Sequence, residues 1–508
     1  MQDAHALFLC YYQNLNLNFN FATEAVMALH LYNSLTRQKE EFKPVESGQV
    51  GIYVCGPTVY GPPHLGHAKS YITFDVLVKH LRNSGLKVRY VQNITDVGHL
   101  TDDADSGEDK IQRQARLDQV HPWEIVDKWT RQYMNDMEKL HVAHPNFYVR
   151  ASQHIGEQIE AVQALLNSGH AYEVDGNVYF SVETFPEYGK LSGRRLEEQK
   201  EGTRVESRSD KKNSRDFALW KKAEPGHILK WSSPWGEGYP GWHIECSVMA
   251  TKYLGKTFDI HGGGLENKFP HHECEIAQSE SMNSAPFCKY WVHNNMVTVD
   301  GIKMGKSLGN FKTCEDLLSR HSPEAIRAFI LTTHYRSPSN YTEEAIAATA
   351  TGLTRLAQLR ASLQELVDKN IAAGSADADV EKICSEVEMK IAERLDDDID
   401  TPGAIAALYS FVTDVNKFIA SSALSSASAE RAINLVQRWG GDILGILPPL
   451  QTSASDMDIA PVMDMLIELR KEMKASKKFD VADAIRDRLK DSGILIEDTR
   501  EGTRWRKA

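Results

Sequence analysis

Two short motifs of this sequence combine side chains that suit phosphate chemistry. His64 and His67 stand three positions apart with Gly66 between them, and apolar residues at helical spacing follow. In the first turn of a helix both imidazoles would point the same way, beside backbone N–H groups that bind phosphate oxygens. Much later, Lys303 and Lys306 lie on a glycine-containing loop, where mobile ammonium groups suit a triphosphate. The two motifs together predict that these four side chains catalyse activation of an acid by ATP, with Gly66 among the ATP-binding residues.

A second set of residues has the donor types that zinc prefers. Cys55 precedes the histidine motif, Cys246 follows a tryptophan-containing segment, and His271 and Glu275 belong to a dense run of histidine, glutamate and cysteine. If that run is helical, His271 and Glu275 are one turn apart and face one point. Zinc commonly takes four thiolate, imidazole or carboxylate ligands, and two thiolates would be its soft anchors. The joint pattern predicts a metal site, although each residue alone would be taken for a buried cysteine or a surface histidine.

The other cysteines and histidines near this run are given a different interpretation. We treat His272 and Cys274 as neighbours of the site rather than ligands. The remaining cysteines are expected to be small buried apolar residues: Cys10, Cys288, Cys314 and Cys384.

A glycine-rich turn is a third candidate for nucleotide binding. Asp259 to Gly264 ends a predicted strand with three consecutive glycines, which let a backbone approach a ribose or adenine closely. We assign His261 and Gly263 to ATP binding on this ground, although a glycine triplet more often marks an ordinary turn. Glu266 could bond the ribose hydroxyls or be a solvated loop carboxylate.

The elements that position these residues are predicted from hydrophobic periodicity. A strand, a helix with Tyr71, Phe74, Val78 and Leu81 on one face, and a second strand form a βαβ unit between residues 50 and 96. An α/β fold follows, with a parallel sheet that an insertion splits and a helical bundle after it. Ser322 and Pro323 mark a helix start. The expected parts are a disordered extension (1–26), a catalytic domain in two halves (27–150 and 241–311), a connective insertion (151–240), a linking region (312–345), the bundle (346–450) and a small C-terminal unit (461–508).

Composition limits the kinds of protein this can be. The chain has 508 residues, 42% hydrophobic and 25% charged, and no apolar run long enough for a membrane span. Its seven cysteines, an odd number, favour a reducing compartment such as the cytoplasm over a disulfide framework. The net charge of −12 argues against wholesale capture of nucleic acid, so any RNA contact depends on local basic patches at residues 470–478 and 504–507.

The motifs resemble those of a known family. The histidine and lysine motifs resemble the two signature sequences of class I aminoacyl-tRNA synthetases, and longer segments resemble the cysteinyl-tRNA synthetases in particular. Those segments are Tyr53 to Tyr60, Gly241 to Cys246, Phe269 to Glu273, Thr333 to Pro338 and Gly502 to Arg506. The resemblance implies a Rossmann-like sheet split by a connective insertion, a helical bundle and a small anticodon-binding unit at the C-terminus.

The resemblance also implies partners and residue roles. It implies ATP with Mg²⁺, L-cysteine and tRNA(Cys) as ligands, with Lys306 contacting ATP. Thr95 and Trp242 would line the amino-acid pocket, and one zinc ion per chain would be held by the four residues named above. Zinc would bind the substrate's thiolate directly, and serine would be refused because a hydroxyl does not ionise in this range. We expect a monomer.

The chain departs from the family pattern at several positions. Gly305 replaces the usual serine of the lysine motif, and Gly98 to Gly107 looks like an insertion relative to the shorter pattern. Two other functions compete with the synthetase: a ligase that joins cysteine to an amino sugar, and an RNA-binding protein without catalysis. The helical bundle and C-terminal unit argue against the first, and the intact histidine and lysine motifs argue against the second.

Overall fold

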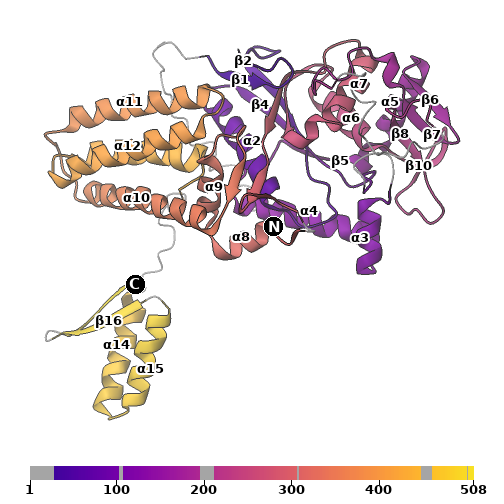
Figure 1. Ribbon diagram of the computed structural model, residues 1–508. Coiled ribbons are helices and arrows are strands. Elements are labelled where there is room, and N and C mark those ends of the chain that lie inside the picture. Colours follow the sequence, from indigo (N-terminus) through magenta and orange to yellow (C-terminus); the bar gives the residue numbers. More distant parts are fainter. Residues whose placement is uncertain are drawn as a thin grey trace, which may run out of the picture. The chain divides into compact units, whose positions relative to one another are not determined.

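The computed structural model describes residues 28–101, 107–194, 211–305, 308–447, 460–492, 494–499 and 502–507. The chain divides into two compact units, Met1–Pro448 and Pro449–Ala508 (Figure 1). The predicted N-terminal extension, 1–26, lies outside the described residues. In the part of the chain that is described, no helix has both the length and the apolar character that crossing a bilayer requires.

The centre of the first unit is a five-stranded sheet in the order β12-β11-β3-β4-β5. All neighbouring strands are parallel, as apolar runs buried on both faces predict. Helices α2 (Leu65–Asn83), α6 (Trp242–Leu254) and α7 (His271–Asn283) accompany it. The strands are β3 (Gln49–Val54), β4 (Lys87–Ile94), β5 (Phe147–Arg150), β11 (Phe258–Gly264) and β12 (Cys288–Asn294). Because three of them precede the insertion and two follow it, the predicted split parallel sheet is confirmed.

The insertion folds around an antiparallel sheet in the order β6-β7-β8-β10-β9. Helix α5 (Ile155–Asn167) precedes the sheet and packs against α6 and α7, so the insertion shares an apolar core with the two helices that carry the predicted ligands. Its strands are β6 (Ala171–Val174), β7 (Asn177–Phe180), β8 (Phe217–Lys222), β9 (Trp231–Ser233) and β10 (Gly236–Pro240), and short 3₁₀ turns η1 (Ala151–His154) and η2 (Val182–Thr184) flank the sheet's first half.

Smaller elements surround the sheet. A hairpin of β1 (His30–Asn33) and β2 (Gln38–Glu41) opens the described chain, and α3 (Lys110–Asp118) and α4 (Pro122–Lys139) lie between β4 and β5. After β12 a three-stranded sheet forms in the order β14-β13-β15. It consists of β13 (Val297–Val299), β14 (Ile302–Lys303) and β15 (Ser339–Tyr341), with η4 (Leu265–Lys268), α8 (Cys314–Arg320) and α9 (Pro323–Leu331) as further helices of this region.

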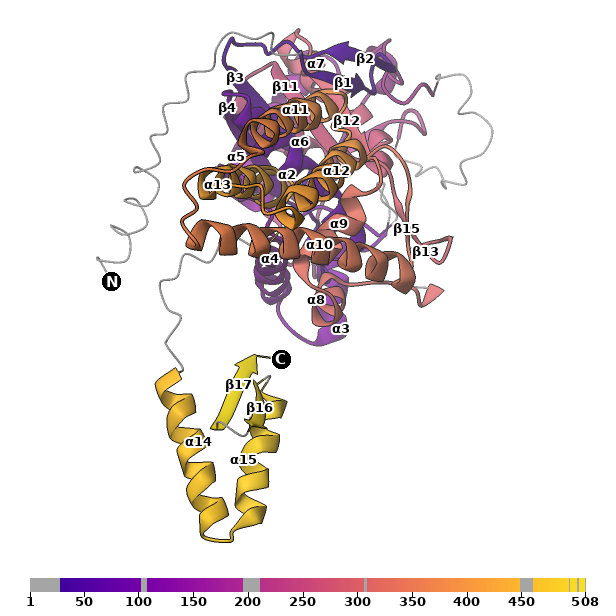
Figure 2. The same cartoon turned by 90° about the vertical axis from the view of Figure 1, so that its left-hand side faces the viewer.

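The helical bundle closes the first unit (Figure 2). Leu353, Leu356, Leu363 and Leu366 predict one buried face of its first helix; the first three are buried and Leu366 is partly buried. Helix α9 starts where the sequence indicates, since the Ser322 side chain accepts a hydrogen bond from the N–H of Ala325. The bundle consists of α10 (Glu343–Asp368), α11 (Asp377–Asp396), α12 (Thr401–Ala420), α13 (Ser426–Val436) and a π-helical segment, η6 (Gln437–Ile443).

The second unit is small. Helices α14 (Ala460–Ala475) and α15 (Phe479–Asp491) pack together, and α15 also contacts an antiparallel hairpin of β16 (Ile494–Thr499) and β17 (Gly502–Lys507).

Candidate active site

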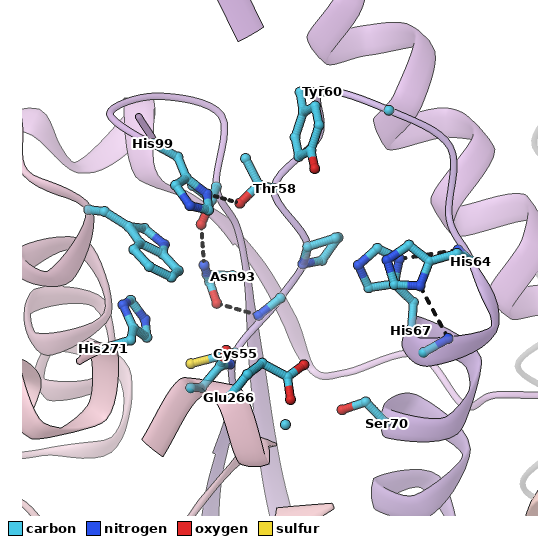
Figure 3. Close-up of a pocket in the computed structure, with 18 of the residues that line it drawn as sticks. Cys55, Thr58, Tyr60, His64, His67, Ser70, Asn93, His99, Glu266 and His271 are labelled. Carbon is cyan, nitrogen blue, oxygen red and sulfur yellow. Dashed lines mark hydrogen bonds between the residues drawn. The ribbon is translucent and has the colours of Figure 1, made fainter. Parts of the chain in front are cut away.

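A cavity of about 550 Å³ opens where β3 and β4 end and α2 begins (Figure 3). Its lining includes His64 and His67, predicted to act on phosphate, and Thr95 and Trp242, predicted to bind the amino acid. In open α/β sheets, ligands bind outside the carboxyl ends of the strands. The structure therefore brings the predicted phosphate and amino-acid residues to one cavity at the expected edge of the sheet.

The histidine motif forms the start of α2. His64 is the N-cap residue: its Nδ1 accepts from the Gly66 N–H at 3.1 Å, and its own N–H donates to His67 Nδ1 at 3.3 Å. The two rings stack with centroids 3.8 Å apart. Because each Nδ1 accepts a hydrogen bond, each neutral imidazole carries its proton on Nε2. The helix start thus combines two imidazole donors with the positive end of the helix dipole, an arrangement that attracts phosphate oxygens.

The lysine motif lies close to this helix start. Leu65 N–H donates to the carbonyl of Lys312 at 3.0 Å, and Met304 approaches Gly66. Lys303 is exposed at the end of β14, and Asn310 closes the loop by donating to the Lys303 carbonyl at 3.2 Å. Lys306, the motif's second lysine, lies outside the described residues.

A series of hydrogen bonds links polar residues at the cavity. Asn93 accepts from the Gly56 N–H at 2.7 Å and donates to Thr95 Oγ1 at 3.0 Å. The Thr95 hydroxyl in turn donates to buried Glu245. A Cβ on Gly56 would lie 1.6 Å from the Asn93 carbonyl oxygen, so only glycine fits there. Neither Asn93 nor Glu245 was predicted from the sequence to be a site residue, although they lie close in sequence to the predicted residues Thr95 and Cys246.

Trp242 lies between two histidine rings. The ring of His99 stacks on it at 4.0 Å and the ring of His271 at 4.2 Å, counted between centroids. Lys110 Nζ donates to His99 Nε2 at 2.8 Å, so His99 presents Nδ1–H to the hydroxyl of Thr58 at 2.5 Å. His99 belongs to the predicted insertion at Gly98–Gly107, whose residues 102–106 lie outside the described chain.

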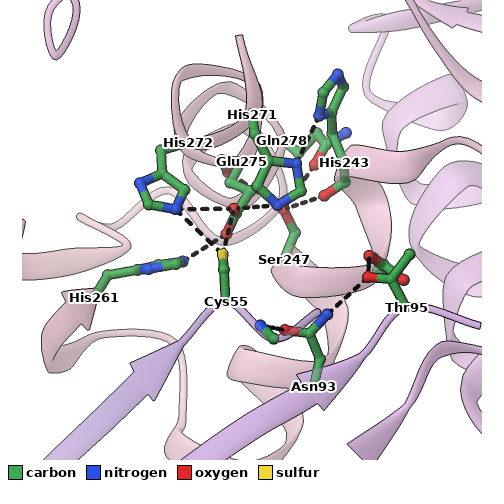
Figure 4. A network of polar contacts seen from close by, with 12 residues as sticks. Cys55, Asn93, Thr95, His243, Ser247, His261, His271, His272, Glu275 and Gln278 are labelled. Carbon is green, nitrogen blue, oxygen red and sulfur yellow. Dashed lines mark hydrogen bonds and ion pairs between the residues drawn. The ribbon is translucent and has the colours of Figure 1, made fainter. Parts of the chain in front are cut away.

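The four predicted metal ligands meet beside the cavity. Figure 4 shows Cys55, His271 and Glu275 of this set close together. One ligand atom from each of Cys55, Cys246, His271 and Glu275 lies within 4.8 Å of all the others, and all four residues are buried. His271 Nε2 is 3.1 Å from Glu275 Oε1, and Cys55 Sγ is 3.9 Å from the same oxygen. Ligands of a tetrahedral zinc stand roughly 3.3–3.8 Å apart, given bond lengths of about 2.0–2.3 Å. The donor types and spacings therefore fit zinc with little rearrangement.

A second set shares two of these residues. Cys55 and Glu275 also lie within 4.8 Å of ring nitrogens of His261 and His272. His272 Nε2 is 3.2 Å from Cys55 Sγ, and His261 Nε2 is 2.7 Å from Glu275 Oε2. The buried His261 side chain, which the sequence analysis had assigned to ATP binding, thus contacts the ligand cluster, and the ATP contact expected of this turn would have to use its backbone.

Burial controls the protonation of the ligand residues. Desolvation raises the pKa of the Cys55 thiol to about 11 and that of Cys246 well above its ordinary value. Desolvation also lowers the pKa of His271, keeping its imidazole neutral. His243 Nδ1 lies 2.9 Å from His271 Nδ1, so the outer nitrogen is held and Nε2 faces the other ligands. A divalent cation would displace the proton of each thiol, whereas a neutral imidazole binds through a nitrogen that carries none.

The sequence of the chain matches known protein families. A family model described as the tRNA synthetases class I (C) catalytic domain matches residues 41–351, and a DALR domain model matches residues 390–448. The cysteine–tRNA ligase of Chlorobaculum tepidum is 55% identical over 491 residues, which are 94% of this chain and 99% of the relative. That of Thermus thermophilus is 47% identical over 482 residues, again 94% and 99% of the two chains.

A solved structure has the same fold. Methionyl-tRNA synthetase of Mycobacterium tuberculosis, in complex with methionyl-adenylate, has a TM-score of 0.58 at 14% identity. The match covers 82% of this chain and 94% of that chain.

Proposed function

The chain belongs to the cysteine–tRNA ligase family of class I aminoacyl-tRNA synthetases, and on that premise we propose that it activates L-cysteine with ATP and transfers the cysteinyl group to the 3′ end of tRNA(Cys). Zinc would be held by Cys55, Cys246, His271 and Glu275, and Mg²⁺ would accompany ATP. The observation that carries the proposal is the position of this ligand set. Cys55 and His271 also line the cavity that contains the histidine motif, so the substrate's sulfur and its carboxylate would be bound in one space.

The metal would supply selectivity. A zinc-bound thiol is deprotonated outright, whereas the hydroxyl of serine gives zinc only a weak neutral ligand. Selection of cysteine over serine therefore needs no separate editing domain.

In the activation step, a carboxylate oxygen of cysteine attacks the α-phosphorus of ATP, and the bond to the β-phosphate oxygen breaks. His64 and His67 would donate their Nε2 protons in hydrogen bonds to the α-phosphate oxygens as negative charge grows there. Lys303 and Lys306 would hold the departing pyrophosphate. Such a step needs little covalent participation of the protein, so positioning and charge stabilisation account for the rate.

The remaining site residues would bind the two substrates. Gly66 and the turn with His261 and Gly263 would let the backbone approach ATP. Thr95 donates its own proton to Glu245, which supports a role for its oxygen as an acceptor for the ammonium group of cysteine. Trp242, fixed between two rings, would cover the substrate.

The experiment is ATP–pyrophosphate exchange with L-cysteine, followed by charging of tRNA(Cys). We expect exchange with cysteine and none above background with serine, loss of exchange after chelation and recovery with Zn²⁺. Cys246→Ser should abolish exchange. Cys274→Ser should keep it, because the Cys274 sulfur, although it lies on α7, is hydrogen-bonded to the Tyr188 hydroxyl at 3.4 Å. Exchange that survives in the Cys246→Ser protein would refute the zinc proposal, and exchange without charging would refute the role in tRNA acylation.

A further inference from the structure

A buried lysine of α2 has no role in the proposed reaction. Lys69 has a relative exposure of 0% and stands two positions after His67. Its Nζ donates to the carbonyl of Ser337 at 2.7 Å and to the carbonyl of Met296 at 3.3 Å. Desolvation lowers its pKa to about 8, so the fold gives up hydration of an ammonium group to make these two contacts. An apolar side chain would fill the same space without that loss.

The two carbonyls lie where the sheet with the lysine motif begins. Met296 immediately precedes β13, and Ser337 lies two residues before β15. The two strands pair in parallel, and the Met296 carbonyl also accepts the N–H of Ser339 at 3.2 Å. Strand β14, with Lys303, pairs with β13. One ammonium group therefore binds the backbone just before β13 and just before β15, the two strands of this sheet that pair in parallel.

The other end of this link is the helix that carries the catalytic histidines. His64 is the N-cap residue of α2, and His67 and Lys69 lie in its first two turns, so one continuous helix carries all three. A displacement of the lysine motif relative to α2 would move pyrophosphate contacts away from α-phosphate contacts. In well-oriented sites a misplacement of about 1 Å costs about 10²-fold in rate.

We propose that Lys69 is a positioning residue for the activation step, which fixes the sheet carrying Lys303 against the helix carrying His64 and His67. The proposal rests on the proposed function, because the roles of these three side chains are part of it. Lys69 is not among the residues that line the cavity, so it acts through the two strands that it holds.

The test compares three substitutions in the full-length zinc-loaded protein. Lys69→Met keeps the volume and removes the donors, Lys69→Arg keeps donors, and Lys79→Met is the matched control. Lys79 lies on the same helix and also donates to a carbonyl, that of His141 at 3.0 Å, which is not connected to the lysine motif. We expect Lys69→Met to lower kcat of pyrophosphate exchange about 10–100-fold with KM for cysteine and zinc content unchanged. Lys69→Arg should recover at least part of that loss, and Lys79→Met should stay within about twofold of wild type even if its melting temperature falls.

A second measurement does not depend on the reaction. Hydrogen–deuterium exchange of peptides covering residues 297–303 and 339–341 should become faster in Lys69→Met and stay unchanged in Lys79→Met. Unchanged protection of these strands from deuterium exchange would overturn the proposal. So would loss of zinc together with equal losses in the kinetic parameters for cysteine and for ATP. Should Lys69→Met not fold, Lys69→Gln is compared in the same two measurements. A wild-type protein without cysteine-dependent exchange would instead refute the proposed function, and the deuterium measurement would still decide the role of Lys69.

Discussion

Zinc binding to the four-residue set should release about two protons, and this number separates the two ligand sets. Burial raises the pKa of Cys55 to about 11 and that of Cys246 well above its ordinary value, so both thiols are protonated in the metal-free protein at pH 8. Both must lose their protons to bind zinc as thiolates. Imidazoles have an ordinary pKa of about 6.5 and are neutral at pH 8. The set that contains His261 and His272 includes one thiol, and would release about one proton.

The size of the pH effect follows from the linkage between zinc binding and proton release. Each proton released on binding changes the apparent free energy by about 1.4 kcal/mol per pH unit, so two protons change it by about 2.7 kcal/mol. The sign is fixed: the metal-free protein holds the protons, so a rise in pH favours the zinc complex. Between about pH 7.5 and 8.5 the apparent zinc affinity should rise about 100-fold for two thiols and about 10-fold for one. The pKa of Glu275, also raised by burial, affects both sets alike because the residue is common to them.

The assay is titration calorimetry of the metal-free protein with Zn²⁺ in buffers of different ionisation enthalpy, which yields the proton number directly. Cys274→Ser is the matched control and should leave the number at about two. Cys246→Ser should bind zinc at least about 100-fold more weakly, with about one proton released where binding is still measurable. If wild type releases one proton and Cys246→Ser releases the same number, Cys246 is not a ligand and the assignment made from the sequence is wrong.

Three further predictions concern the cavity. Thr95→Val removes the hydroxyl between Asn93 and Glu245 and should raise KM for cysteine in exchange about 10-fold, which corresponds to about 1.4 kcal/mol; an unchanged KM would contradict a contact with the substrate. Gly56→Ala places a Cβ 1.6 Å from a backbone oxygen and should destabilise the protein by about 3 kcal/mol or more, seen as a lower midpoint in denaturant unfolding. His64→Ala should lower kcat of exchange about 10²–10³-fold while zinc content stays at wild-type level, and equal loss of zinc would point to damage of the fold instead.

Much of the fold could be predicted because local patterns agree with the tertiary structure. Tyr71, Phe74, Val78 and Leu81 recur at helical spacing, and all four are at most 3% exposed in α2. A capping residue fixed the start of α9 in the same way. Periodicity and capping are properties of neighbouring residues, so a single sequence contains them. The pairing of β3 with β11, on either side of the insertion, joins residues far apart in the chain and is not a property of neighbouring residues.

What the sequence did not reveal depends on residues far apart in the chain. Lys69 acts on two carbonyls more than 200 positions away, and Glu245 meets Thr95 across 150 positions. A lysine inside a helix ordinarily lies on a solvated face, and a glutamate beside a cysteine gives no local indication of burial. Only the three-dimensional structure shows that both side chains lose their water.

Sequence patterns do not decide which of the two histidines of α7 binds the metal. His271 and His272 lie four and three positions before Glu275, and both spacings bring a side chain to the same side of a helix. Each also has its second nitrogen held by another histidine, His271 by His243 at 2.9 Å and His272 by His293 at 2.9 Å. Neither helical periodicity nor the surrounding hydrogen bonds therefore distinguishes them.

The cavity does distinguish them. His271 and Cys55 belong to its lining, whereas His272 and His261 do not. An ion that binds the sulfur of a substrate must have a coordination position open to the space in which the substrate lies. In the other set, which also contains Glu275, Cys55 alone belongs to the lining, so an ion bound there would lie farther from the cavity and could stabilise the fold without meeting cysteine. If zinc is to select the substrate, it must therefore be bound by the set that contains His271. The number of protons released on zinc binding, which distinguishes one thiol from two, thus also tests whether the metal can reach the amino acid.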